Sequence, residues 1–291
     1  MPNLLDLQKS SAQKIIVFGP PKSGKTLLIG KLAVKYQLIW FDLEYGVDTL
    51  RQLPRELQAN ITVIRIKDTL ENPRAHATID KIVKGGKFKI CDDHGTVDCA
   101  TCLAKKDQAS WTEVEIPAVE NEDTLKKVVV IDSASQLTVS VNATVTLSRS
   151  ETYKETFDDW AAQGKYLNRI LSRIQQAPYH CIVTAHEVLA EREDGSKRIV
   201  PSIGTVNYAS NCSKFFGHSV YVDKQNLKHR AWSDTTYSNN VLTGSRLNVK
   251  VEAMEVPDLL PMLTGEVAPN LPSKAEQKAK ILNTLESLKL K

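Results

Sequence analysis

A glycine-rich stretch near the start of the chain constrains the fold more than any other feature of the sequence. Residues 18–26 read FGPPKSGKT, after the apolar run 15–17 and before apolar residues at helical spacing. Gly19 and Gly24 permit backbone angles that other residues disfavour, so successive N–H groups can turn toward phosphate oxygens. A strand, a glycine loop and a helix, in this order, are the context that a phosphate-binding P-loop requires. The stretch therefore predicts nucleoside triphosphate binding.

Each part of the loop has an expected role. The positive end of the following helix favours bound phosphate. Lys25 is predicted to reach the β- and γ-phosphates, and the Thr26 hydroxyl to ligate Mg²⁺. The alternative, an ordinary strand–turn–helix with a chance lysine, does not account for the whole pattern. The residues expected to contact ATP are Gly19, Pro20, Pro21, Lys22, Ser23, Gly24, Lys25, Thr26 and Leu27.

Length and composition set broader limits. The 291 residues can bury a substantial core, as one large α/β domain or as a domain with an appendage. No apolar run approaches the ~18 residues of a membrane helix, and residues 1–6 lack a signal pattern, so we expect a cytoplasmic protein without a membrane partner. The net charge of +4 neither demands nor excludes nucleic acid.

The order of elements predicts an α/β fold with a mostly parallel sheet and helices on both faces. We expect a lead-in over 1–13, a core over 14–260, a linker over 261–272 and an amphipathic helix over 273–291. Residues 87–118 interrupt the alternation and are interpreted as an insertion. Strands are predicted at 14–18, 38–41, 61–64, 128–131, 181–184, 220–222 and 247–252, helices at 27–35, 73–83, 135–147 and 157–176, and a hairpin turn at Asp194-Gly195.

Three polar features follow predicted strands, at the edge where such sheets bind ligands. Asp132 follows an apolar strand and can hold Mg²⁺; capping the next helix is the alternative. Glu44 can orient the attacking water, with Asp42 as its competitor and a solvated loop acid as the other interpretation. His186 can contact the γ-phosphate, although a lone histidine is more often a satisfied structural side chain.

Together these residues resemble the RecA-type ATPase core. The stretch 41–48 is similar to the strand that carries the water-activating glutamate of that family, which corresponds to Glu44. Residues 130–133 resemble its Walker B strand, His186 stands at its γ-phosphate sensor, and 214–216 resemble the segment after its second DNA loop. The resemblance covers about 14–252. A short core of this kind is most similar to phage single-strand annealing proteins of the Sak group, P-loop AAA-type proteins.

That resemblance implies an ATPase that binds single-stranded DNA and promotes its annealing in phage recombination, inside an infected bacterial host. Its two DNA loops correspond to 143–157, with Arg149, Tyr153 and Lys154, and to 187–212. The alternative is a solvated hairpin, because glutamates dilute the charge. In the second loop the expected DNA contacts are Arg192, Lys197, Arg198 and Tyr208.

The resemblance also implies a homo-oligomer, a ring or a filament, in which a neighbouring subunit supplies a basic residue to the ATP site. Arg246 is the first choice for this residue and Lys250 the second; a surface cation on an edge strand is the alternative. A single-strand-binding protein or another replication or recombination protein is a further possible partner.

The insertion carries Cys91-x-x-His94 and Cys99-x-x-Cys102, two chelating pairs with a four-residue spacer. Three thiolates and one imidazole are the ligands of a closed, structural Zn²⁺ site. Reduced free thiols are the alternative. Nearby lysines make contact with DNA or a partner conceivable, and Cys181 and Cys212 are interpreted as structural.

The leading hypothesis is thus an ATP-dependent protein that binds and anneals single-stranded DNA, with a DNA-stimulated ATPase. The alternatives are a hexameric helicase-like motor, a small-molecule P-loop kinase, and a nucleotide-gated scaffold. The helix at 273–291 could dock on its own core, on the next subunit or on a replication protein.

Overall fold

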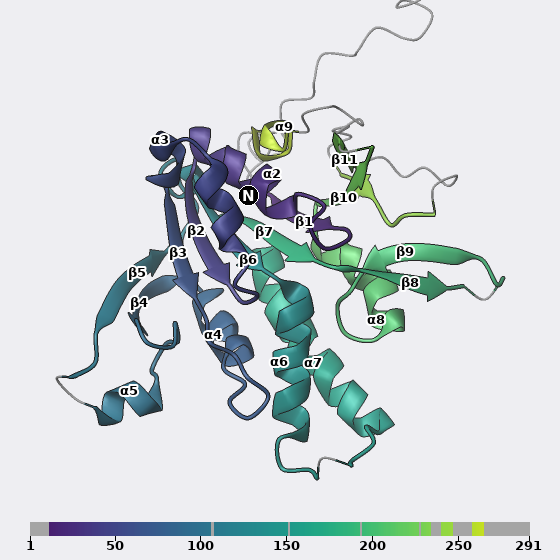
Figure 1. The fold of residues 1–291 in the computed structure, drawn as a ribbon, viewed down its shortest axis with the longest axis horizontal. Helices are drawn as coiled ribbons and strands as arrows, with labels where there is room; N and C mark the ends of the chain where they lie inside the picture. Colours follow the sequence, from purple (N-terminus) through teal and green to yellow (C-terminus); the bar gives the residue numbers. More distant parts are fainter. Residues whose placement is uncertain are drawn as a thin grey trace, which may run out of the picture.

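The computed structural model describes residues 12–105, 108–150, 152–192, 194–226, 228–233, 240–246 and 258–264. Its centre is an eight-stranded sheet (Figure 1). Apolar residues fill the strands almost continuously, which suits a sheet covered on both faces. The strands are β1 (Lys14–Phe18), β2 (Gln37–Asp42), β3 (Ile61–Arg65), β6 (Lys127–Asp132), β7 (His180–Ala185), β10 (His218–Gln225), β11 (Lys228–Trp232) and β12 (Gly244–Ser245).

The strand order is β11-β10-β1-β7-β6-β2-β3, with β12 beside β10. All neighbours are parallel except β11 and β12, which pair antiparallel with β10. One strand, β7, separates β1 from β6. The carboxyl ends of β1, β7, β6 and β2 therefore lie next to one another at one edge of the sheet, where all four segments expected at the ATP site begin.

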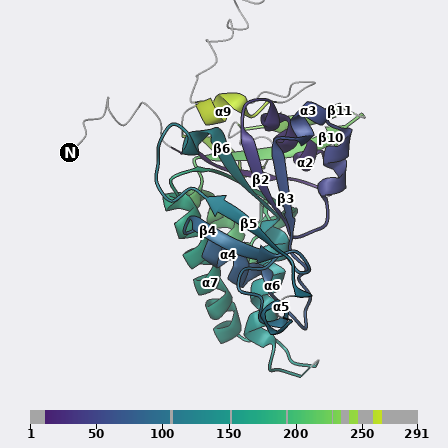
Figure 2. The ribbon, with the colours of Figure 1, turned by 90° about the vertical axis from the view of Figure 1, so that its left-hand side faces the viewer.

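Helices cover both faces of this sheet (Figures 1 and 2). In β1, Ile16 and Phe18 face one buried cluster, while Ile15 and Val17 face the other. The first cluster is covered by α4 (Ala75–Ile82), α6 (Ala134–Thr146), α7 (Phe157–Gln176), α8 (Val206–Asn211) and η5 (Cys212–Phe215). The second is covered by α2 (Lys25–Gly30), η1 (Lys31–Val34), η2 (Val47–Gln52), α3 (Arg55–Gln58) and α9 (Leu260–Thr264).

Two small antiparallel units stand outside the main sheet. One consists of β4 (Gly86–Cys91) and β5 (Trp111–Ile116), with α5 (Ala100–Ala104) between them, and lies beyond the β3 edge (Figure 1). The other is the hairpin of β8 (Glu187–Glu191) and β9 (Lys197–Pro201). The short helix η4 (Thr124–Lys126) leads from β5 into β6. The interruption predicted at 87–118 is thus a compact β-unit.

The predicted fold class is confirmed: the central sheet is mostly parallel and is flanked by helices. The helix predicted over 27–35 is shorter, because α2 ends at Gly30 and tightens into η1. Gly30 is a poor helix former, and a Cβ there would lie 2.5 Å from Leu50 Cδ2, so close packing against η2 uses this glycine. Among the described residues, no helix has both the length and the apolar character needed to cross a bilayer.

Two further differences concern the late part of the chain. The strand β11 was not predicted, because it lies at the edge of the sheet and most of its residues are polar, so the sequence has no apolar run there. The prediction of a linker from residue 261 is wrong for 261–264, which belong to α9, where Met262 and Leu263 are buried against the core. The lead-in up to residue 11, the strand at 247–252, the rest of the linker and the helix at 273–291 lie outside the described residues.

Candidate functional site

The loop after β1 has the backbone that its glycines predicted. Gly19 has φ +151° and Gly24 has φ +99°, both in the range that favours glycine. A Cβ on Gly19 would lie 1.9 Å from the carbonyl oxygen of Val222, so the loop is pressed against β10. Lys25 Nζ donates to the carbonyl oxygens of Gly19 and Pro20, at 2.9 and 2.8 Å. The ammonium group therefore lies inside the loop.

Asp132, at the end of β6, faces the first turn of α2. Its Oδ2 lies 3.5 Å from Thr26 Oγ1, and its Oδ1 accepts a hydrogen bond from Thr184 at the end of β7. Burial raises the pKa of Asp132 to about 6, and the bond from Thr184 opposes that shift. Burial also lowers the pKa of Lys25, although the negative charges of Asp132 and Glu44 act to raise it. The structure thus brings together the two residues expected to hold Mg²⁺.

Glu44 lies beside Asp132 and makes two side-chain contacts. Ser133 Oγ donates to Glu44 Oε1, and His186 Nε2 lies 3.2 Å from Glu44 Oε2. Burial raises the pKa of Glu44, but the hydrogen bonds from His186 and Ser133 outweigh burial and leave this pKa below its ordinary value. The carboxylate is therefore held ionised and in place. An ionised, fixed carboxylate can orient and polarise a water molecule.

The structure separates Glu44 from its competitor. Asp42 is fully buried, and its Oδ1 accepts from the backbone N–H of Gly46 at 3.1 Å. Its Oδ2 lies 3.6 Å from Arg65 Nε, on the neighbouring strand β3. Burial raises the pKa of Asp42, and these partners oppose the shift. Asp42 thus shapes the turn that follows β2, whereas Glu44 reaches the group around Lys25 and Asp132.

His186 joins this group to the β8–β9 hairpin. Its backbone N–H donates to Ser135 Oγ at 2.9 Å, and its carbonyl oxygen accepts from the N–H of Ser202 at 2.8 Å. Ser135 Oγ also donates to the carbonyl oxygen of Ser202, so one hydroxyl at the start of α6 holds both ends of the hairpin. The next residue, Glu187, begins β8 and accepts a hydrogen bond from the Tyr221 hydroxyl at 2.7 Å.

The residues expected to contact DNA lie in two places. Arg192, Lys197 and Arg198 are on the hairpin, with Lys197 exposed near its turn. Tyr208 is instead on α8, where its half-buried ring packs against the core and its hydroxyl donates to Asn168 Oδ1 at 3.1 Å. Burial raises the pKa of Tyr208. The structure therefore does not bring Tyr208 to the exposed hairpin turn.

The loop predicted over 143–157 is shorter than expected, because α6 continues to Thr146 and α7 begins at Phe157. Within it, the Arg149 guanidinium lies over the Tyr153 ring, 5.0 Å from the centroid, and the Tyr153 hydroxyl donates to Asp159. The thirteen residues of α6 place this loop roughly 20 Å from the end of β6. It lies far from the ATP site of its own chain.

Arg246 also lies away from the loop at Lys25. Its N–H donates to the carbonyl oxygen of Gly217 and its Nη2 to that of Lys214, both at 2.9 Å. These contacts hold it beside the amino end of β10, whereas the loop at Lys25 follows the carboxyl end of the parallel strand β1. Arg246 could serve an ATP site only in another copy of the chain. Lys250 lies outside the described residues.

The four predicted metal ligands converge. One ligand atom from each of Cys91, His94, Cys99 and Cys102 lies within 4.8 Å of the others. His94 Nδ1 is 3.2 Å from Cys102 Sγ, 3.4 Å from Cys99 Sγ and 3.8 Å from Cys91 Sγ. Tetrahedral Zn²⁺ with ordinary bond lengths would place nitrogen and sulfur about 3.6 Å apart. The donor set and its spacing therefore fit zinc.

The sequence interpretation did not include several polar side chains of the site. Ser133 donates a hydrogen bond to the Glu44 carboxylate, and Thr184 donates one to the Asp132 carboxylate. Ser135 donates to the carbonyl oxygen of Ser202 at the end of the β8–β9 hairpin. His229, on the unpredicted strand β11, has Nδ1 2.6 Å from the carbonyl oxygen of Ser23. Their positions at or just after strand ends were the available signal for Ser133 and Thr184. His229 had no such signal, because its approach depends on the antiparallel pairing of β11.

The strand order, the glycine loop and the acidic ends of β2 and β6 define a P-loop nucleoside triphosphatase. A family model described as an AAA domain matches residues 11–209, so the chain belongs to this family of nucleotide-binding ATPases. A comparison with curated proteins finds no match.

Proposed function

We propose that this protein is a Mg²⁺-dependent ATPase that binds single-stranded DNA and anneals it during phage recombination. Family membership supports the ATPase. The DNA function rests on the resemblance of about residues 14–252 to the RecA-type core, on the likeness of this short core to the Sak group, and on one structural observation. That observation is the contact between Glu44 and His186, the residue immediately before the β8–β9 hairpin, which carries Arg192, Lys197 and Arg198.

The site supports hydrolysis by groups of this chain. Lys25 and the loop amides bind the phosphates of ATP, and Glu44 accepts a hydrogen bond from the attacking water and orients it. Thr26 and Asp132 would hold Mg²⁺, which neutralises charge on the phosphate oxygens when bound. The fixed partners of Glu44 keep its carboxylate ionised and aligned before ATP arrives.

His186 offers a route from the phosphates to DNA. Its side chain contacts Glu44, and its backbone is bonded to both Ser135 and Ser202 at the base of the hairpin. A change at Glu44 on hydrolysis would shift His186 and, with it, the hairpin. Arg192, Lys197 and Arg198 would contact phosphates of the strand, while Tyr208 contributes through packing rather than through stacking on a base.

The decisive measurement is ATP hydrolysis with and without a poly-dT oligonucleotide. We expect the oligonucleotide to stimulate the wild type, and the R192E/K197E variant to lose this stimulation and to bind the oligonucleotide more weakly, with a smaller salt dependence. The matched control is K35E/K126E, which makes the same change of charge at exposed lysines away from the hairpin. Equal stimulation of both variants would place the DNA contact elsewhere.

Other outcomes would replace the proposal. ATP hydrolysis that no nucleic acid stimulates would remove DNA from the function. Directional unwinding of a duplex would favour the helicase-like motor over annealing. Transfer of the γ-phosphate to a small molecule would favour a kinase, and nucleotide binding with negligible turnover would favour a nucleotide-gated scaffold.

We also propose that the protein acts as a homo-oligomer in which Arg246 completes the ATP site of a neighbour. Its own Lys25 is at the opposite edge of the sheet, which supports a role in trans. The test mixes two variants, K25A and R246A. If Arg246 acts in trans, mixed oligomers contain sites with both residues, and part of the ATPase activity returns. A mixture as inactive as its components would exclude this role.

We further propose that the protein holds a structural Zn²⁺ at Cys91, His94, Cys99 and Cys102. We expect one zinc per chain in metal analysis of the purified protein. The C99A variant should lose this zinc, whereas C212A, which changes a buried cysteine outside the cluster, should retain it. Wild-type protein that is fully folded and free of zinc after expression in zinc-supplemented medium would contradict the assignment.

A further inference from the structure

The cysteine-rich unit touches the main sheet at one end of β3. We call residues 91–102 the knuckle. The carbonyl oxygen of His94, itself one of the four candidate metal ligands, accepts a hydrogen bond from the N–H of Lys67 at 2.9 Å. Gly95 has φ +68°, and a Cβ there would lie only 1.9 Å from the carbonyl oxygen of Arg65. The knuckle backbone therefore packs directly on the chain that leaves β3.

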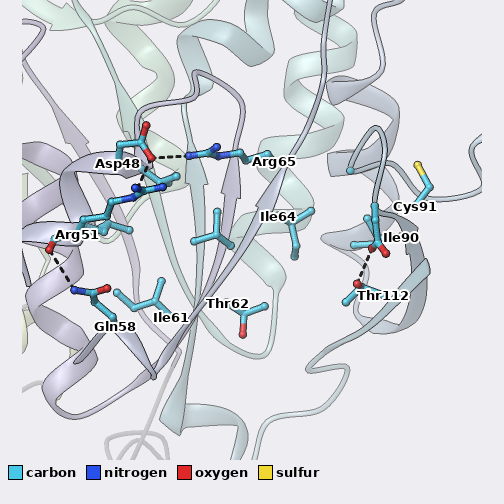
Figure 3. A pocket seen from close by; sticks show the side chains of 15 residues that line it. Asp48, Arg51, Gln58, Ile61, Thr62, Ile64, Arg65, Ile90, Cys91 and Thr112 are labelled. Carbon is cyan, nitrogen blue, oxygen red and sulfur yellow. Dashed lines mark hydrogen bonds and ion pairs between the residues drawn. The ribbon is translucent and has the colours of Figure 1, made fainter. Parts of the chain in front are cut away.

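The rest of the β3 edge is separated from this unit. A groove of about 520 Å³ runs between them, lined by Thr62 and Ile64 on one side and by Ile90 and Thr112 on the other (Figure 3). The figure also shows the ion pair of Asp48 and Arg65 at this groove, 2.9 Å between Oδ1 and Nη2. Contact between the knuckle and β3 is thus concentrated at the carboxyl end of the strand.

That end of β3 is bonded to the turn that carries Glu44. The N–H of Ile66 donates to the carbonyl oxygen of Asp42 at 2.9 Å, and Arg65 Nε lies 3.6 Å from Asp42 Oδ2. Asp42 in turn accepts from the N–H of Gly46 and so closes the turn around Glu44. A short series of hydrogen bonds and packed backbone therefore leads from His94 to the carboxylate beside the ATP site.

We propose that the metal-bound knuckle positions Glu44 by holding the end of β3 against Asp42. His94, Gly95 and Arg65 are positioning residues in this arrangement, since none of them lies among the groups around Lys25. The catalytic consequence rests on the role proposed above for Glu44. The cluster itself is small: among the described residues, the apolar side chains packed against the buried Cys91, Cys99 and Cys102 are those of Ala109 and Trp111. So small a core depends on metal for its shape.

The test uses a variant that keeps all four ligands. G95A forces a Cβ toward Arg65 and should displace the knuckle from β3. We expect it to retain one zinc per chain and to bind a non-hydrolysable ATP analogue within twofold of wild type, because Lys25 lies on α2 and Asp132 on β6, away from β3. Its kcat should fall roughly tenfold, as expected for a misplaced catalytic group. Amide exchange over residues 42–48 should be faster.

The matched control is K81A. It removes another contact of the knuckle, the exposed ion pair of Lys81 Nζ with Asp98 Oδ2 at 2.9 Å, and should match wild type in zinc, exchange and kcat. If G95A loses zinc or does not fold, R65M is the second variant: it keeps the knuckle and removes the ion pairs of Arg65 with Asp42 and with Asp48. R65M should show the same fall in kcat with unchanged binding of the analogue, and R65K should restore part of it.

The outcomes separate this proposal from the function on which it rests. Unchanged exchange over 42–48 in zinc-loaded G95A and in R65M would overturn the positioning role. Faster exchange with unchanged kcat would also overturn it, because Glu44 would not depend on the knuckle. Faster exchange in a protein whose wild type does not hydrolyse ATP would instead overturn the role of Glu44, while the contact between knuckle and turn would stand.

Discussion

Glu44 and His186 lie in direct contact, with 3.2 Å between Oε2 and Nε2, although the strands β3 to β7 lie between them along the chain. The contact forms because β2, β6 and β7 are consecutive neighbours in the sheet, so that their carboxyl ends meet. It places the side chain expected to orient water against the first residue of the segment that leads into the hairpin. A signal between ATP and the hairpin can therefore pass through one side-chain contact.

The first prediction concerns Glu44 itself. E44Q keeps the size of the side chain but removes the negative charge that orients water, so ATP hydrolysis should fall by about 10²- to 10⁴-fold while ATP still binds. Phosphate release and calorimetric titration with Mg²⁺ and ATP measure the two properties. E56Q, at an exposed residue of α3, is the matched control and should hydrolyse ATP like wild type. Activity of E44Q within tenfold of wild type would exclude Glu44 as the water-orienting group.

The second prediction concerns the folding stability that is lost by burying the ionised carboxylate of Asp132. Because burial raises the pKa of Asp132 from 3.8 to about 6, protonation of this group stabilises the folded protein at acidic pH, and that contribution is lost as the pH rises through 6. At pH 8 the nucleotide-free D132N variant should therefore be more stable than wild type, by roughly 3 kcal/mol, with the difference fading toward pH 4. Denaturant unfolding at both pH values measures it.

The same variant should bind ATP more weakly in the presence of Mg²⁺, because the amide cannot replace a carboxylate ligand. A D132N protein that is less stable than wild type at pH 8, and no different in its Mg²⁺ dependence, would contradict both parts of the argument.

The third prediction concerns Thr184, which donates a hydrogen bond to Asp132. This bond favours the ionised carboxylate and opposes the effect of burial on the pKa. In T184V the pKa of Asp132 should rise further, so the acid limb of kcat/KM, measured at subsaturating Mg²⁺, should move to higher pH. T184S keeps a hydroxyl group and should retain the wild-type limb. Coincident limbs for T184V and wild type would remove Asp132 as the group that sets this limb.

The sequence could predict the central sheet because its strands are continuous apolar runs, such as 128–131, which only a covered strand or helix accommodates. The acidic residues after these runs could be assigned to one edge, since parallel strands end together. The two cysteine pairs were informative for a similar reason. Their short spacing leaves few ways to place four ligands, and the structure brings all four together.

The choice between Asp42 and Glu44 could not be made in this way. Both follow the same strand, and the turn after it decides which carboxylate reaches the site. Tyr45 in that turn has φ +58°, and the N–H of Leu43 donates to the carbonyl oxygen of Asp132 at 2.6 Å. Neither the hydrogen bond to the neighbouring strand nor the positive φ of Tyr45 can be predicted from the residue types. The polar strand β11 was missed because only its pairing with β10 makes it a strand.

The final prediction tests the glycine loop against an ordinary glycine of the same chain. Gly24 has φ +99°, and a Cβ there would lie 2.6 Å from His229 Nδ1, so G24A should distort the loop amides and weaken ATP binding roughly tenfold or more. Gly164 lies within α7 with nothing within 4 Å of an added Cβ. G164A should therefore stabilise the protein by about 0.5–1 kcal/mol and leave ATP binding unchanged. Calorimetry and thermal unfolding compare the two. If G24A bound ATP like G164A, the loop backbone would not be the phosphate cradle, and the phosphate contacts would have to come from Lys25 and Asp132-bound Mg²⁺ alone.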